Sequence, residues 1–104
     1  MTLHTPSIEN ARHPELARFV EDRAILRGKF VLASGLESSY YCDGKRASFS
    51  GEGLGLITDA LLKELQQVEF DAVGGMDMGA TPIVAAVAMR AYQLGRGLPT
   101  FVVR

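Results

Sequence analysis

The residues best placed to do chemistry form a glycine-rich stretch over residues 74–81. A β-type run precedes this stretch and an apolar helical run follows it, so it should end at a helix N-terminus. Free backbone N–H groups and the helix dipole favour an anion there, and glycines let backbone approach a phosphate. A phosphate or pyrophosphate site is therefore predicted. The stretch matches neither the dinucleotide fingerprint nor the P-loop, and Asp77 is acidic, so an ordinary turn remains an equal alternative.

Two aromatic residues, Tyr40 and Tyr41, form the second feature of chemical interest. Neighbours on a strand face opposite sides, so one ring could cover a flat ligand while the other enters the core. Two ordinary strand aromatics are the simpler interpretation. Cys42 follows without a neighbouring histidine or helix N-terminus, which favours a structural cysteine over a nucleophile.

Charged residues give weaker signals. Lys45 and Arg46 follow a turn, and we interpret them as surface residues, with an anion contact as the alternative. Arg104 ends a β-type run, on the side where open α/β sheets bind ligands, so anion binding and terminal fraying are both consistent with its position. His4 and His13 fit no metal-binding spacing and are expected to be solvated.

Composition limits the class of protein. The chain has 104 residues, 47% of them hydrophobic, and 11 Lys+Arg against 12 Asp+Glu give a net charge of −1. One globular domain is expected, with small-molecule chemistry and with neither nucleic acid nor membrane as a partner. A single cysteine excludes an intrachain disulfide, and no signal-peptide core or membrane-length apolar run occurs. We therefore expect a cytoplasmic protein.

The first half of the chain should form a helix, a β-ribbon and a second helix. Apolar spacing predicts a helix over residues 14–26, and the ribbon should use residues 30–33 and 39–42. Ser50 can cap the second helix, which continues to Leu65. Glycines at its start predict a loose first turn.

The second half predicts a βαβ unit. A strand over residues 70–73, a helix from residue 81 to 91 or 94, and a strand over residues 99–103 follow one another. Thr81 suits the N-cap, Pro82 the first helical position and Gly95 the left-handed position after the helix. The two strands should be parallel, and the helix is so apolar that it must be covered on more than one side. The fold class is α/β.

The chain ends directly after a strand. A two-stranded parallel sheet would leave an open edge and an apolar helix exposed. We expect either a truncated fragment of a longer enzyme or a chain that a partner subunit completes.

Three segments together resemble orotate phosphoribosyltransferases: GKFVLASG with SSYYCD (28–35 and 38–43), VGGMDMGATPI (73–83) and FVVR (101–104). The resemblance implies a type I phosphoribosyltransferase fold, truncated, as one partial domain over residues 1–104. Residues 1–48 would form an N-terminal hood and residues 49–104 the start of the α/β core. It also implies a homodimer that uses Mg²⁺ with phosphoribosyl pyrophosphate (PRPP) to convert orotate to orotidine 5′-monophosphate.

The resemblance also assigns ligand contacts, though no catalytic residue and no metal ligand. Orotate would contact Ser34, Gly35, Tyr41 and Cys42, PRPP would contact Arg104, and pyrophosphate would face Gly75, Met76, Asp77, Met78 and Gly79. Many family members have lysine in place of Ala33 and of Met78. The acidic, threonine- and glycine-rich turn that holds the ribose and its phosphate is absent from residues 1–104.

Two alternatives stay open. One is a non-catalytic truncated fragment or subunit-interaction module that lacks the PRPP-binding turn. The other is a phosphoribosyltransferase relative that acts on another base or serves as a regulator.

Overall fold

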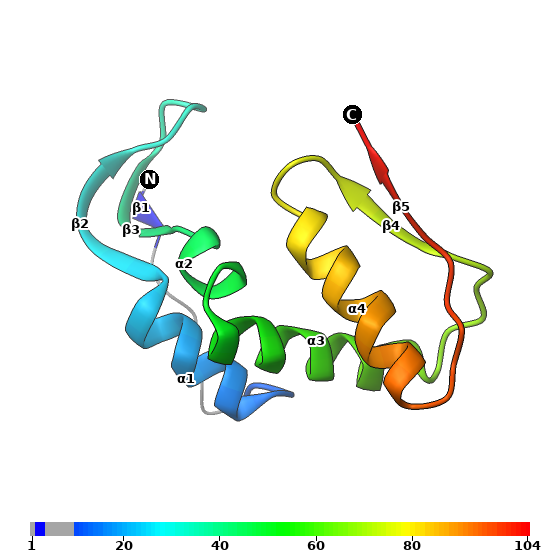
Figure 1. The fold of residues 1–104 in the computed structure, drawn as a ribbon. Helices are drawn as coiled ribbons and strands as arrows, with labels where there is room; N and C mark the ends of the chain where they lie inside the picture. Colours follow the sequence, from blue (N-terminus) through cyan, green and yellow to red (C-terminus); the bar gives the residue numbers. More distant parts are fainter. Residues whose placement is uncertain (1, 4–9) are drawn as a thin grey trace.

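The computed structural model describes residues 2–3 and 10–104, so His4 lies outside the described residues. Figure 1 shows a β-ribbon with three helices beneath and beside it, followed by a βαβ unit. The elements are β1 (Thr2–Leu3), α1 (Pro14–Arg23), β2 (Ile25–Val31), β3 (Glu37–Cys42), α2 (Lys45–Ser48), α3 (Gly51–Leu65), β4 (Val73–Met76), α4 (Thr81–Gln93) and β5 (Thr100–Val103). The α/β class is confirmed.

The predicted ribbon is confirmed as an antiparallel pair, β2 with β3, and β1 adds a parallel strand on the other side of β3. The predicted bounds of its first strand, residues 30–33, are wrong, because β2 runs from Ile25 to Val31. The prediction that the first helix reaches residue 26 is wrong, because α1 ends at Arg23 and β2 begins at Ile25. Ala24 is fully buried between them, and its carbonyl accepts a hydrogen bond from the N–H of Asp43 at 2.8 Å. Backbone pairing across the ribbon therefore overrides the helical spacing of the side chains.

The helix predicted after Ser50 is confirmed as α3, and the Ser50 hydroxyl accepts a hydrogen bond from the N–H of Gly53 at 3.2 Å. Gly53 has a packing role that the sequence did not indicate. A Cβ at this position would lie 2.6 Å from Cε1 of Phe19 and 2.9 Å from Cα of Ala47. The glycine thus lets α1 and α2 approach α3 closely.

The predicted βαβ unit is also confirmed. β4 and β5 are parallel, in register from Val73 opposite Thr100 to Met76 opposite Val103. The first strand begins at Val73 rather than at residue 70, and it includes Gly74 and Gly75. As predicted, α4 is covered on two sides, by α3 and by the β4–β5 sheet, with its buried residues Val84, Val87 and Ala91.

The ends of α4 differ in how well they were predicted. Ala80 is the N-cap and makes no side-chain cap, so Thr81 is the first helical residue and Pro82 the second. The C-terminal prediction is confirmed, because Gly95 has φ +88°. The N–H groups of Gly95 and Arg96 donate to the carbonyls of Tyr92 at 2.9 Å and Ala91 at 2.8 Å, which closes the last helical turn.

An ionic contact ties the start of α1 to the end of α3. Nε2 of His13 lies 2.9 Å from Oε1 of Glu64, and the Arg12 guanidinium lies 3.2 Å from Oε2. The hydrogen bond from His13, followed by the charge of Arg12, lowers the pKa of Glu64. His13 is therefore a half-buried structural contact, and the prediction that it is simply solvated is wrong. Among the described residues, no helix is long and apolar enough to cross a membrane.

The close approach at Gly53 can be tested by substitution. Gly53→Ala is expected to lower the free energy of unfolding by about 1–3 kcal/mol, because the new methyl group meets backbone atoms of α2 that cannot move freely. Gly55→Ala is the matched control, since a Cβ there meets nothing within 4 Å. In the control, the free energy of unfolding should rise by up to about 1 kcal/mol, because alanine has a higher helix propensity than glycine. Urea unfolding of both variants measures the difference, and equal effects would contradict the packing role.

Candidate functional site

The β4–α4 loop, residues 77–80, is a tight, hydrogen-bonded turn. The carbonyls of Met76 and Met78 accept hydrogen bonds from the N–H groups of Ala80 and Thr81, each at 3.0 Å. The Thr81 hydroxyl donates to Oδ1 of Asp77 at 2.9 Å. The Asp77–Met78 peptide bond is cis. Thr81 therefore holds the Asp77 carboxylate beside the first turn of α4, instead of capping the helix as predicted.

The glycines of this region have different surroundings. A Cβ at Gly74 would overlap the ring of Phe101, and one at Gly75 would lie 2.5 Å from the Cβ of Ala80. At Gly79 a Cβ would meet nothing within 4 Å. Gly74 and Gly75 thus serve strand and turn packing, and Gly79 is the glycine whose backbone is open to an approaching ligand.

Arg104 is placed next to this loop. The N–H of Asp77 donates to the carbonyl of Val103 at 2.8 Å, which extends the β4–β5 pairing to the residue before Arg104. Figure 1 shows the chain end beside the loop that joins β4 to α4. The structure therefore brings together the predicted pyrophosphate-facing residues 75–79 and the predicted PRPP contact, Arg104, at the carboxyl ends of two parallel strands. This is the edge at which open α/β sheets bind ligands.

The predicted orotate contacts are divided between the two ends of the ribbon. Ser34 and Gly35 form its tip, where Gly35 has φ +87° and the Ser34 hydroxyl accepts from the N–H of Leu36 at 3.5 Å. Tyr41 and Cys42 end β3 at the base of the ribbon, and both are exposed. At about 3.4 Å per residue, Leu36 and Tyr41 are roughly 17 Å apart along the strand. The structure does not bring these two pairs together.

Tyr41 is the exposed aromatic of its pair. Its ring centroid lies 5.9 Å from that of Phe30, at an interplanar angle of 36°, while 49% of its surface is exposed. Tyr40 is half-buried. This difference agrees with the expectation that strand neighbours face opposite sides, with Tyr41 the ring available to a ligand.

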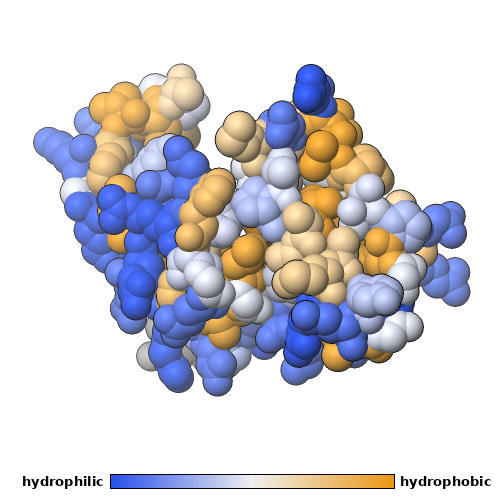
Figure 2. Space-filling view, viewed as in Figure 1, coloured by the Kyte–Doolittle hydropathy of each residue, from blue (hydrophilic) through white to orange (hydrophobic). Residues whose placement is uncertain are grey.

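A short helix next to the ribbon was missed by the sequence analysis. α2 covers four residues, Lys45–Ser48, where a charged turn was expected, and it ends at Phe49. Four residues are too few to show helical periodicity, so no sequence signal could have found it. Figure 2 shows the surface hollowed between the ribbon side of the molecule and the β4–β5 side. Phe49, the residue directly after α2, is 66% exposed, and Met78, in the β4–α4 loop, is 70% exposed.

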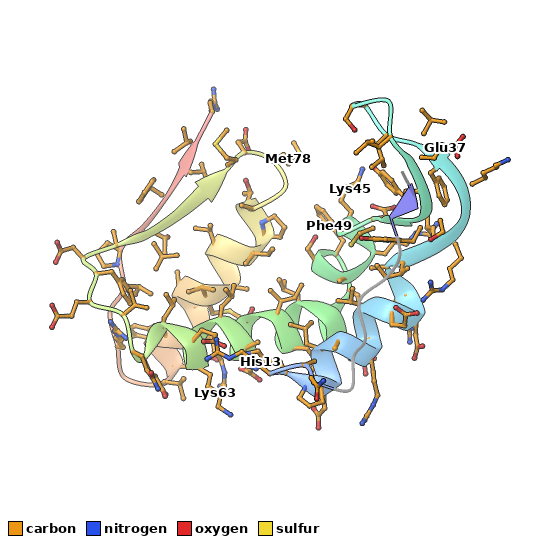
Figure 3. The ribbon with its side chains drawn as sticks, turned by 180° about the vertical axis from the view of Figure 1, so that it is seen from behind. His13, Glu37, Lys45, Phe49, Lys63 and Met78 are labelled. Carbon is orange, nitrogen blue, oxygen red and sulfur yellow. The ribbon has the colours of Figure 1, made fainter. Side chains whose placement is uncertain are left out.

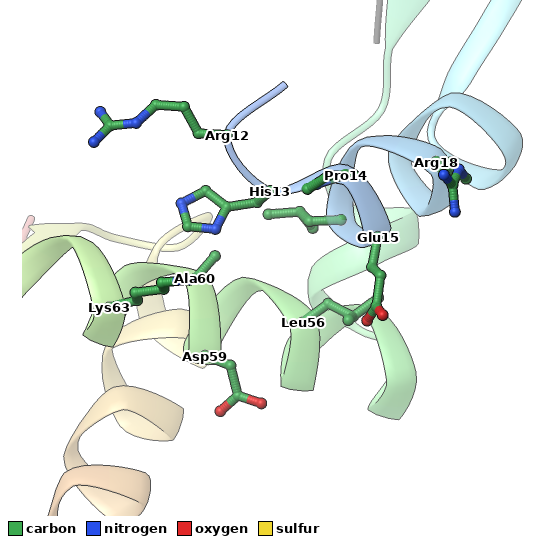
Figure 4. Close-up of a pocket in the computed structure, with 10 residues that line it drawn as sticks. Arg12, His13, Pro14, Glu15, Arg18, Leu56, Asp59, Ala60 and Lys63 are labelled. Atoms are coloured by element: carbon green, nitrogen blue, oxygen red, sulfur yellow. The ribbon is translucent and has the colours of Figure 1, made fainter. Parts of the chain in front are cut away.

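A separate cavity of about 510 Å³ lies between the start of α1 and α3 (Figure 4). Its rim mixes cations, including Arg18 and Lys63, with the carboxylates of Glu15 and Asp59. Figure 3 shows Lys63 at the opposite end of the molecule from Met78. None of the residues assigned to orotate, pyrophosphate or PRPP lines this cavity. The opposite charges on its rim favour no particular ligand, so the β4–α4 loop remains the candidate site.

The turn geometry predicts the effect of adding one methyl group. Gly75→Ala is expected to lower the free energy of unfolding by about 1–3 kcal/mol and to shift the amide NMR signals of residues 77–81, because its Cβ would collide with Ala80. Gly79→Ala, which faces open space, should leave both nearly unchanged. A Gly75→Ala variant with wild-type spectra would contradict the tight packing of this turn.

Comparison with known proteins gives three results, the first of which is that no family model matches the chain. The second is a match to curated relatives. The orotate phosphoribosyltransferase of Streptomyces coelicolor is 44% identical over 90 residues, which cover 86% of this chain and 50% of the relative. That of Corynebacterium glutamicum is 34% identical over 98 residues, with 94% and 52% covered. The chain thus spans about half the length of the curated relatives it matches.

The third result is similarity to solved structures. The orotate phosphoribosyltransferase of Mycobacterium tuberculosis in complex with Fe(III) dicitrate matches with a TM-score of 0.72 and 32% identity, covering 86% of this chain and 52% of that chain. The same enzyme in complex with PRPP matches with a TM-score of 0.68 and 31% identity, covering 86% of this chain and 51% of that chain. The chain is therefore a homologue of the orotate phosphoribosyltransferases that corresponds to the N-terminal half of their fold.

Proposed function

We propose that this chain provides the N-terminal half of an orotate phosphoribosyltransferase, an enzyme of pyrimidine synthesis. The observation that carries the proposal is the placement of Arg104 beside the β4–α4 loop, in a fold that resembles a solved PRPP complex with a TM-score of 0.68. The reaction transfers the phosphoribosyl group of PRPP to orotate and yields orotidine 5′-monophosphate and pyrophosphate. Residues 1–48 act as the hood and residues 49–104 as the start of the core.

The reaction needs little covalent participation from the protein. A ring nitrogen of orotate forms a bond to the anomeric carbon of PRPP while the bond from that carbon to pyrophosphate breaks. Positive charge develops on the ribose and negative charge on the departing pyrophosphate, so catalysis consists mainly of positioning and electrostatic stabilisation. In this scheme the loop over residues 75–79 meets the leaving group through its open backbone at Gly79, together with the Arg104 guanidinium. The N–H of Asp77 already donates to the carbonyl of Val103.

Mg²⁺ would arrive with PRPP as part of the substrate and would supply neutralisation of the pyrophosphate charge. Mg²⁺ keeps several waters and binds through substrate phosphates and one or two carboxylates rather than in an all-protein cage. Among residues 2–3 and 10–104, no group of three or more His, Cys, Asp or Glu side chains is arranged to hold a metal ion. Asp77 is the carboxylate of the β4–α4 loop, and Thr81 already donates to it.

Orotate is placed by the hood in this proposal. The Tyr41 ring, half exposed at the base of the ribbon, and Cys42 beside it face the base of the substrate. Ser34 and Gly35 lie at the tip of the ribbon, too far from Tyr41 to contact the same small ring. We also propose a cytoplasmic homodimer, as the family resemblance implies.

A second candidate function is supported by the exposed apolar surface of the last strand. Phe101 is 53% exposed, and Val102 and Val103 are likewise exposed. Such a strand is suited to pairing with another polypeptide. The chain would then be a non-catalytic subunit-interaction module that lacks the PRPP-binding turn.

Orotate consumption, followed by absorbance in the presence of PRPP and Mg²⁺, separates the two candidates. The 104-residue chain alone is expected to show no turnover, because its relatives are about twice as long. A chimera that continues from Arg104 into the C-terminal half of the Streptomyces coelicolor relative is expected to turn over. Turnover by the short chain would contradict the need for a second half. A folded chimera without activity would favour the non-catalytic module.

Arg104 gives a residue-level prediction. Arg104→Ala in the chimera is expected to weaken PRPP binding about tenfold, which is the loss of one charge-assisted hydrogen bond to phosphate. Arg96→Ala is the matched control, because the Arg96 guanidinium packs 4.8 Å above the ring of Phe70, after the end of α4. Calorimetry measures both affinities. Unchanged affinity in Arg104→Ala would remove Arg104 from the site.

A further inference from the structure

Helix α2 presents a cation and an aromatic ring on one side. The N–H of Phe49 donates to the carbonyl of Lys45 at 3.0 Å, so these residues are one helical turn apart and their side chains share a face. Figure 3 shows both on the side of α2 turned toward the β4–α4 loop, where Met78 lies. They therefore border the hollow next to the candidate site, and the proposed function gives them no role.

The charge of Lys45 is not neutralised by its neighbours. The nearest acidic residue in sequence, Asp43, pairs with Arg46 instead, with Nε and Oδ2 3.4 Å apart. In the part of the chain that the structure describes, Lys45 makes no ion pair, and its side chain is exposed. An ammonium group in this state is available to an anionic ligand.

The ring of Phe49 is exposed although its helix is anchored. Ala47 and Ser48 are almost completely buried, at 2% and 4% exposure, while Phe49 is 66% exposed. The two buried residues fix α2 against α3, so the ring stands directly after the end of a packed helix. A rigidly presented aromatic face is suited to stacking on a flat ligand.

We propose that Phe49 and Lys45 select the base in this site: the Phe49 ring stacks on the planar pyrimidine, and the Lys45 ammonium pairs with its carboxylate. Stacking tolerates any flat ring, whereas the ion pair requires the carboxylate. Lys45 therefore distinguishes orotate from uracil, and Met78 provides apolar surface across the hollow. This inference rests on the proposed function and adds two binding residues to it.

The test compares two ligands that differ by the carboxylate. NMR titrations of the 104-residue chain with orotate and with uracil are repeated on Lys45→Gln and Phe49→Ala. Lys45→Gln is expected to weaken the binding of orotate about tenfold and to leave the affinity for uracil unchanged, because only orotate carries the carboxylate. Phe49→Ala should weaken the binding of both ligands by similar factors, about tenfold. Lys63→Gln is the control, since Lys63 is exposed at the opposite end of the molecule (Figure 3). Amide spectra establish that each variant is folded.

The outcomes separate this inference from the proposed function. Orotate binding that neither substitution weakens overturns the inference and leaves the proposed function intact. If Lys45→Gln weakens the binding of orotate and of uracil equally, the role of Lys45 in selecting the base is overturned. If wild type binds no orotate but binds nicotinate, another planar carboxylate, in a way that depends on Lys45 and Phe49, the selection of orotate is overturned and these two residues are assigned to a different carboxylate. Binding of neither carboxylate overturns the inference, and the proposed function is then decided by the turnover of the chimera.

Discussion

The close packing around α3 is the constraint on which the rest of the structure depends. α3 contacts α1 and α2 near its start and α4 further along, so it joins the ribbon to the βαβ unit (Figure 1). Gly53 permits the first of these contacts, because any side chain there would collide with Phe19 and with the backbone of Ala47. Val84, Val87 and Ala91 of α4 are the buried residues of the second half. The separation between the ribbon and the β4–α4 loop is therefore fixed by helix packing.

In the candidate loop, neighbouring positions require glycine for different structural reasons. Gly74 is required because the ring of Phe101 occupies the space of its missing side chain, and this contact packs β5 against β4. β5 in turn carries Arg104 to the loop. Gly75 leaves room for Ala80 at the turn, and only Gly79 faces open space. A glycine-rich string read from sequence alone overstates how much of it approaches a ligand, since part of it serves packing that only the fold defines.

The predictions that succeeded relied on local chemistry. The hydroxyl of Ser50 and the left-handed conformation of Gly95 depend on a few adjacent residues, so helix ends at both positions could be predicted, as could the βαβ order from its apolar runs. The predictions that failed concerned residues whose hydrogen-bond partners are distant in sequence or are not the ones that capping rules suggest. α1 ends early because Ala24 pairs with Asp43. Thr81 does not cap α4, because its hydroxyl donates a hydrogen bond to the Asp77 carboxylate instead. Phe49 could not be predicted, because its exposure depends on how Ala47 and Ser48 are buried.

Charge explains why the proposed site needs separate cations. The chain has a net charge of −1, so no general positive field would attract the two anionic reactants of the proposed reaction, and each would require a local contact. Arg104 lies beside the loop proposed for pyrophosphate, and Lys45 lies on α2, across the hollow from it. Asp77, restrained by Thr81, adds negative charge on the loop side. In the proposed reaction, the carboxylate of the base would therefore be repelled from the loop and attracted to α2. The arrangement of charges would thus give each reactant of the proposed reaction its own end of the hollow.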